Sequence, residues 1–114
     1  GSQIDWAAHA NDQEGIIAET LDFDKAIKVA LDFAKKDGET LVVITADHET
    51  GGMIILGGNI EEGTVKTKFT TGGHTGVPVP VYSFGPGEEL FSGIFDNTGF
   101  KERFIETYGL SESK

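Results

Sequence analysis

Residues 12–37 carry the hydrophobic pattern of an amphipathic helix. Apolar side chains recur there at steps of three and four residues, at Ile16, Phe23, Ile27, Ala30, Leu31 and Ala34. Charged side chains fill the other face, at Lys25, Lys28, Asp32 and Lys35. Gly38 comes directly after this pattern and is a typical helix end. Aspartates at positions 22 and 24 favour helix starts, so a break into two helices near residues 21–24 is an alternative.

Short β-like segments follow the helix. The first, residues 41–45, is a continuous apolar and β-branched run that is typical of a buried strand, and its place after a helix favours a parallel sheet. Glycine pairs then separate further candidate strands at residues 53–56, 65–69 and 79–84. A final helix is predicted for residues 97–108, with Phe100, Phe104 and Tyr108 on one face. This order predicts an α/β layered fold whose central, largely parallel sheet is flanked by helices.

Composition narrows the class of protein. The chain has 114 residues, of which 38% are hydrophobic and 25% charged, as expected for a single globular domain spanning residues 1–114. No apolar run approaches the roughly 20 residues that a membrane-spanning helix needs. Acidic residues exceed basic ones by 19 to 9, and the net charge of -10 disfavours binding to nucleic acid. The chain has no cysteine, so any zinc would be bound by histidines and carboxylates.

Each of the three histidines lies near a carboxylate or in a glycine-rich turn. Asp5 and His9 are four residues apart, which places them on one face of a helix, as paired metal ligands require. Asp47 and His48 come just after the first predicted strand, and α/β sheets bind ligands beyond the carboxyl ends of their strands. His74 is flanked by glycines that let a backbone approach a bulky group. Oxygen and nitrogen donors without sulfur are typical of catalytic zinc.

Each of these elements also has a simpler explanation. The spacing of Asp5 and His9 suits a surface ion pair. Asp47 could cap the start of a helix, with His48 as its neighbour, and His74 could be an exposed loop residue. The zinc interpretation depends on the three elements together, because they account for every histidine in the chain.

Three segments of the chain closely resemble the alkaline phosphatases. They are residues 1–11 (GSQIDWAAHAN), residues 45–52 (TADHETGG) and residues 74–80 (HTGVPVP), and they occur in the order typical of that family. The resemblance extends from residue 1 to about residue 100. An Asp-His pair with a distant histidine is shared by a wider superfamily, which includes cofactor-independent phosphoglycerate mutases, nucleotide phosphodiesterases and sulfatases. The longer strings point to the alkaline phosphatase branch.

The resemblance implies a site for two zinc ions. Asp5, His9 and His74 resemble the three protein ligands of the first zinc, and Asp47 and His48 resemble two ligands of the second. In this family a serine attacks the phosphorus of a phosphate monoester, and the phosphoserine that forms is then hydrolysed. The resemblance also implies a magnesium site that lies largely outside this chain.

Trp6, beside Asp5, occupies a position that varies within the family. The resemblance makes it a candidate for substrate binding, through an effect on phosphate and metal affinity. The alternative role is that of a buried aromatic residue that anchors the first helical turn.

The nucleophile of the family has no counterpart in this chain. None of the five serines stands in its sequence context: Ser2, Ser83, Ser92, Ser111 and Ser113. Arg103, the only arginine, does not match the arginine that binds phosphate in the family. Both groups are therefore expected upstream of Gly1. The chain is expected to form the C-terminal part of an alkaline phosphatase domain, an incomplete portion of that fold, and to be inactive alone.

The expected function is the hydrolysis of phosphate monoesters by a longer protein to which this chain contributes zinc ligands. Two alternatives stay open: a phosphodiesterase or mutase of the same superfamily, or a metal-binding or interaction module without catalysis. The family implies a periplasmic or extracellular location and is compatible with a homo-oligomer.

Overall fold

The computed structural model describes residues 1–110, which form two compact units. One unit consists of Gly1–Lys25 and His48–Pro78, and the other of Ala26–Asp47 and the chain from Val79 onward. Ser111 and Ser113, two of the serines considered above, lie outside the described residues. No helix within residues 1–110 combines the length and the apolar character that crossing a membrane requires.

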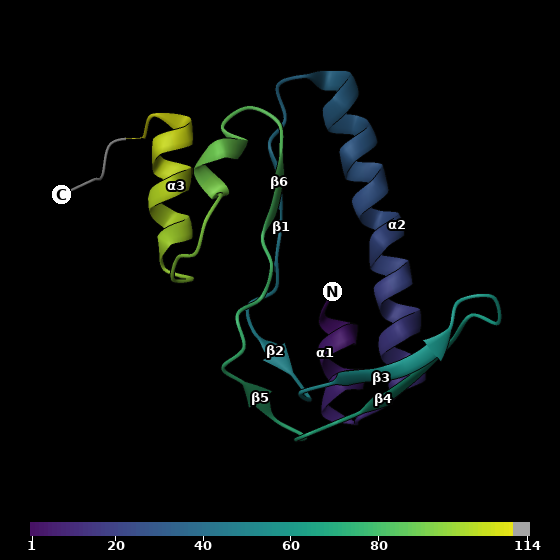
Figure 1. The fold of residues 1–114 in the computed structure, drawn as a ribbon. Coiled ribbons are helices and arrows are strands. Elements are labelled where there is room, and N and C mark those ends of the chain that lie inside the picture. The colour runs from purple at the N-terminus through teal and green to yellow at the C-terminus, as the bar shows by residue number, and fades with distance from the viewer. Residues whose placement is uncertain (111–114) are drawn as a thin grey trace. The chain divides into compact units, whose positions relative to one another are not determined.

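The long predicted helix is confirmed as α2, Gln13–Asp37, the longest helix in Figure 1. The helix is continuous, so the alternative break near residues 21–24 is wrong. All six residues assigned to its apolar face are buried or partly buried, and Ala34 is only 2% exposed. Leu21, Val29 and Phe33 lie on other faces of α2 and are more than half exposed.

The unit that contains His48–Pro78 has two short antiparallel sheets. Helix α1, Ser2–His9, contacts strand β2, Glu49–Thr50, which pairs with β5, His74–Thr75. Strands β3, Ile54–Asn59, and β4, Thr64–Lys68, form a hairpin. The hairpin is held to the start of α2 by the side chain of Gln13, which donates to the Val65 carbonyl (3.2 Å) and accepts from the Thr67 hydroxyl (2.5 Å).

The other unit combines a short antiparallel strand pair with a cluster of aromatic side chains. Strand β1, Val42–Ile44, pairs with β6, Tyr82–Phe84, and a short 3-10 helix, η1, spans Glu88–Phe91. Helix α3, Gly99–Tyr108, ends at Gly109 in the left-handed conformation that favours glycine. Phe91 is 2% exposed, and its ring centroid lies 6.2 Å and 5.0 Å from those of Phe100 and Phe104. Tyr108, predicted to share their face, is 63% exposed.

The predicted central parallel sheet is not present among the described residues. Strand β1 forms where the apolar run predicted it, but β1 and β6 pair antiparallel, as do β2 with β5 and β3 with β4. An apolar run indicates that a strand is buried, whereas the direction of pairing depends on which strand becomes its neighbour. The mixed helix and strand content is as expected. The parallel strand pairing that was predicted is replaced by antiparallel pairing among the described strands.

Candidate metal centre

The first pair of predicted ligands lies on one helix face, as their spacing requires. Asp5 and His9 are one turn apart on α1, and the Asp5 Oδ1 atom lies 3.5 Å from His9 Nε2. Their side chains are 35% and 41% exposed, so both remain accessible from solvent. Helix α1 therefore presents a carboxylate oxygen and an imidazole nitrogen at the same place.

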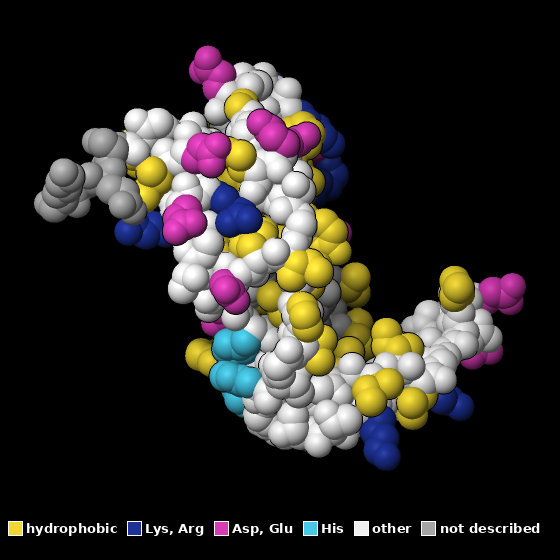
Figure 2. Space-filling view, turned by 60° about the vertical axis from the view of Figure 1, so that its left-hand side comes forward, with side chains coloured by type: hydrophobic (Ala, Val, Ile, Leu, Met, Phe, Trp, Pro, Cys, Tyr) yellow, Lys and Arg dark blue, Asp and Glu magenta, His cyan; other side chains and the backbone are white. Residues whose placement is uncertain are grey.

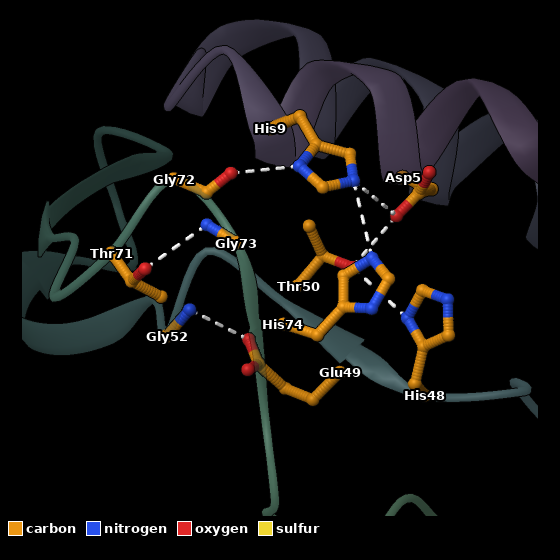
Figure 3. A network of polar contacts seen from close by, with 10 residues as sticks. All are labelled: Asp5, His9, His48, Glu49, Thr50, Gly52, Thr71, Gly72, Gly73 and His74. Atoms are coloured by element: carbon orange, nitrogen blue, oxygen red, sulfur yellow. Dashed lines mark hydrogen bonds and ion pairs between the residues drawn. The ribbon is translucent and has the colours of Figure 1, made fainter.

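Strands β2 and β5 bring the other two histidines to this helix face. In their antiparallel pairing Thr50 is opposite His74, and His48 comes two residues before Thr50. His74 Nε2 lies 3.2 Å from His9 Nε2, and the rings of His74 and His48 stack with centroids 3.6 Å apart. Figure 3 shows the three imidazoles and the Asp5 carboxylate turned toward one another, and Figure 2 shows the histidines together at the surface.

A tight glycine turn lets β2 and β5 approach α1. Gly51 has a φ of +88° and Gly52 a φ of +56°, values that side chains disfavour. A Cβ atom on Gly51 would lie 3.0 Å from the carbonyl oxygen of Ala8. The Gly51 N–H donates to the Gly73 carbonyl (2.9 Å), which joins the turn to the segment that precedes His74. The sequence Glu49-Thr50-Gly51-Gly52 thus brings the strands against the helix that carries Asp5 and His9.

One hydrogen bond sets the tautomer of His9. Its Nδ1 atom lies 2.7 Å from the carbonyl oxygen of Gly72, which can only accept a hydrogen bond. Nδ1 therefore carries the proton, and in the neutral ring Nε2 keeps its lone pair. That lone pair faces His74 Nε2 and the Asp5 carboxylate. A carbonyl partner of this kind is the usual way in which proteins orient a metal-binding imidazole.

The Asp5 carboxylate is stabilised as an anion. The Thr50 hydroxyl donates to its Oδ1 atom (2.7 Å), and this hydrogen bond is the main reason that the pKa of Asp5 lies below its ordinary value. Desolvation opposes the shift, and the nearby His9, His48 and His74 add to the lowering. An ionised carboxylate that faces imidazole nitrogens can bind a cation without first releasing a proton.

The donor chemistry of this cluster fits a divalent metal such as zinc. Ligand atoms of Asp5, His48 and His74 all lie within 4.8 Å of one another, and His9 Nε2 is in direct contact with two of these residues. Imidazole nitrogens and a carboxylate oxygen are the donors of zinc sites that lack cysteine. Residues from three separate parts of the chain thus converge, as a metal site needs.

Two other predicted site residues have different surroundings. Trp6 is 64% exposed, so the alternative of a buried aromatic anchor is wrong. Asp47 is exposed and directly precedes His48 in the chain. The residues whose ligand atoms are in contact or lie within 4.8 Å of one another are Asp5, His9, His48 and His74.

Three residues near the cluster received no role from the sequence alone. Thr50 contacts both Asp5 and His48, and the backbone of Gly72 orients His9. Glu49 accepts hydrogen bonds from the Gly52 N–H (2.8 Å) and from the hydroxyl of Thr75, its partner across the strands. Thr50 and Glu49 belong to the TADHETGG string, which indicated that this segment is important. The Gly72 carbonyl is a backbone group, and no residue type in the sequence indicates its role.

Comparisons with known proteins identify the family to which the chain belongs. The family model for alkaline phosphatases matches residues 1–68, more than half of the chain. Alkaline phosphatase 3 of Bacillus subtilis (strain 168) is 35% identical over an alignment that covers 86% of this chain and 36% of the relative. Streptomycin-6-phosphate phosphatase of Streptomyces griseus is 37% identical, with 96% of this chain and 28% of the relative covered. The chain belongs to the alkaline phosphatase family.

A solved structure gives the same result for the fold. A mutant of TAB5 alkaline phosphatase with Mg bound in its M3 site superposes with a TM-score of 0.88 at 42% sequence identity. The match covers 97% of this chain and 35% of the solved chain. The present chain therefore spans about a third of the length of the proteins that it resembles.

Proposed function

We propose that the protein containing this chain hydrolyses phosphate monoesters, and that Asp5, His9 and His74 bind one zinc ion of its active site. The observation that carries the proposal is that His9 Nε2 lies 3.2 Å from His74 Nε2 and 3.5 Å from Asp5 Oδ1 in a chain of the alkaline phosphatase family. The chemistry that zinc supplies in such a site is Lewis acidity toward the oxygens of a phosphate.

The residues of this chain prepare the site before any metal binds. Gly72 holds His9 with its lone pair directed at the cluster, and Thr50 holds the carboxylate of Asp5 in its ionised form. Because these contacts fix the donors in advance, little ordering remains to be done when a cation enters. His9 and His74 are exposed, which leaves room for a phosphate ester to approach the site.

A second zinc ion and a magnesium ion belong to the same proposal. Asp47 and His48 would supply two ligands of the second zinc, and the remaining ligands would come from parts of the protein outside this chain. Trp6 is an exposed neighbour of Asp5, and its side chain would influence the binding of phosphate and metal. We also infer that β1 joins a larger, largely parallel sheet of one phosphatase domain, and that the protein is periplasmic or extracellular.

The nucleophile and the arginine that binds phosphate are proposed to lie outside this chain. Ser83 and Ser92 donate to the carbonyls of Glu88 (2.9 Å) and Glu89 (2.8 Å), which are structural contacts. Arg103 donates to two backbone carbonyls and stacks on a phenylalanine ring, so its guanidinium is already engaged. Phosphoryl transfer depends on positioning and charge stabilisation, so the chain alone should not catalyse it.

The test is His74→Ala in the longer protein, with Val77→Ala as the matched control. Both changes truncate an exposed side chain of the same segment, but only the first removes a proposed ligand. Turnover of an aryl phosphate should fall by more than about 100-fold in His74→Ala, beyond what loss of a supporting contact costs, and one zinc per chain should be lost. Val77→Ala should keep both.

Three outcomes would count against the proposal. Near-normal turnover of His74→Ala at saturating zinc would show that His74 is not a zinc ligand. Preference of the unaltered protein for a phosphate diester over a monoester would place it among the phosphodiesterases. Absence of any hydrolysis in a zinc-loaded protein would favour a binding module.

A further inference from the structure

The side chain of Thr50 lies between the two sets of proposed metal ligands. Its hydroxyl donates to Asp5 Oδ1 (2.7 Å), and the Nδ1 atom of His48 lies 3.2 Å from the same Thr50 oxygen. Figure 3 shows Thr50 within the group formed by Asp5, His48 and His74. We propose that Thr50 is a positioning residue that couples the two zinc sites, by orienting a ligand of each with one hydroxyl group.

This inference rests on the proposed function for the identity of the metals. The hydrogen bonds of Thr50 from which it is argued are independent of that function. A threonine hydroxyl has one proton and two lone pairs. An ionised carboxylate can only accept a hydrogen bond, so the proton of Thr50 points to Asp5. The contact with His48 must then use a lone pair of the Thr50 oxygen, and His48 Nδ1 must be the donor. Neutral His48 consequently keeps its lone pair on Nε2.

The result for His48 matches that for His9. In His9 a backbone carbonyl places the proton on Nδ1, and in His48 the Thr50 hydroxyl does so. Both imidazoles thus offer Nε2, which is one of the two nitrogens that bind metals in proteins. Two ligand histidines are set in the same tautomer by two unrelated acceptors.

The position of Thr50 is itself fixed from both sides. Its backbone pairs with His74 across β2 and β5, and the preceding Glu49 is held by the Gly52 N–H and by Thr75. Threonine is β-branched, so its side chain has few rotamers within a strand. The hydroxyl is therefore held in place, as the orientation of two ligands requires.

The competing explanation is that Thr50 only stabilises strand β2 through its β-branched shape, and that its hydroxyl has no role. Thr50→Val separates the two explanations, because valine keeps the shape and loses the hydroxyl. Thr50→Ser is the conservative variant, which keeps the hydroxyl and loses the branch. Thr64→Val is the matched control, since it makes the same atomic change at an exposed position of β4.

The first readout is the tautomer of His48 in the zinc-free chain. Long-range proton–nitrogen spectra of the imidazoles distinguish the two tautomers, and a chain with three histidines is readily assigned. We expect the Nδ1–H form of His48 in the unaltered chain, in Thr50→Ser and in Thr64→Val. Thr50→Val should lose this preference. An unchanged Nδ1–H form in Thr50→Val would overturn the inference, whatever the metal content.

The second readout is zinc affinity, measured by competition with a chelator. Loss of a group that orients a ligand costs about 10–100-fold in metal affinity, so Thr50→Val should weaken binding by that factor. Thr50→Ser and Thr64→Val should stay within about threefold of the unaltered chain. Equal affinity of Thr50→Val and Thr64→Val would overturn the coupling. Failure of the unaltered chain to bind zinc would instead contradict the proposed metal site, and the tautomer would still test the role of Thr50.

Discussion

Replacement of Gly51 by alanine should damage the fold at the place where it supports the cluster. Gly51 has a φ of +88°, and a Cβ atom there would lie 3.0 Å from the Ala8 carbonyl oxygen and 3.2 Å from Phe69 Cδ1. The left-handed backbone costs an L-residue about 1–2 kcal/mol. Crowding in a packed site costs about 1–3 kcal/mol more. Gly51→Ala should therefore lower the free energy of unfolding by about 2–5 kcal/mol.

Gly63→Ala is the matched control for this prediction. Gly63 has a φ of +63°, but nothing lies within 4 Å of where its Cβ atom would be. Gly63→Ala should therefore lower the free energy of unfolding only by the cost of the left-handed backbone, about 1–2 kcal/mol. Urea unfolding followed by circular dichroism gives both free energies by linear extrapolation. Equal losses in the two variants would show that the close approach of the turn to α1 is not what stabilises this region.

The same pair of variants links stability to the site. Ala8 precedes His9 on α1, so a Cβ atom pressed against its carbonyl should shift the helix that carries Asp5 and His9. Zinc affinity should fall in Gly51→Ala and stay unchanged in Gly63→Ala. Unchanged affinity in a destabilised Gly51→Ala chain would show that α1 holds its ligands without support from the turn.

Three further predictions concern Arg103, the Lys28–Asp32 pair and the dependence of activity on metal. Arg103 donates to the Leu90 carbonyl (2.7 Å) and stacks 3.6 Å from the centroid of Phe95, so Arg103→Leu should destabilise the chain by about 1–3 kcal/mol; an unchanged melting temperature would contradict this. The Lys28 ammonium donates to Asp32 and is the main reason that the pKa of Asp32 lies below its ordinary value, so Lys28→Met should raise that pKa toward it in a carboxyl NMR titration. Any stability from this exposed pair is present at neutral pH and is lost as the pH falls through the lowered pKa. An unchanged pKa of Asp32 in Lys28→Met would show that Lys28 does not cause the lowering. Chelation should abolish phosphate release by the longer protein, and added zinc should restore it; activity that survives complete removal of metal would exclude a metal-dependent reaction.

Local patterns predicted the helices well. The apolar face of α2 follows from steps of three and four residues, and the residues so chosen, from Ile16 to Ala34, are all buried or partly buried. The nearness of Asp5 and His9 follows from the same geometry, because four residues make about one helical turn. These properties depend on neighbours in the sequence, which a sequence displays directly.

Contacts between residues far apart in the sequence could not be predicted from local patterns in the same way. Nothing in the composition of residues 72–76 indicates that a carbonyl would contact His9, or that His74 would lie opposite Thr50. The convergence of the histidines was suggested by the three elements taken together, and their assignment as ligands came from the resemblance to a family. The parallel sheet was an inference about strand neighbours, and the described strands have antiparallel ones. Pairing partners are set by the whole fold rather than by the strand itself.

The most direct test of the metal site is anomalous diffraction at the zinc absorption edge, from crystals of the longer protein. We expect a zinc peak at about 2.0–2.2 Å from Nε2 of His9, Nε2 of His74 and a carboxylate oxygen of Asp5. A zinc-loaded protein whose peaks all lie away from these three side chains would contradict this expectation.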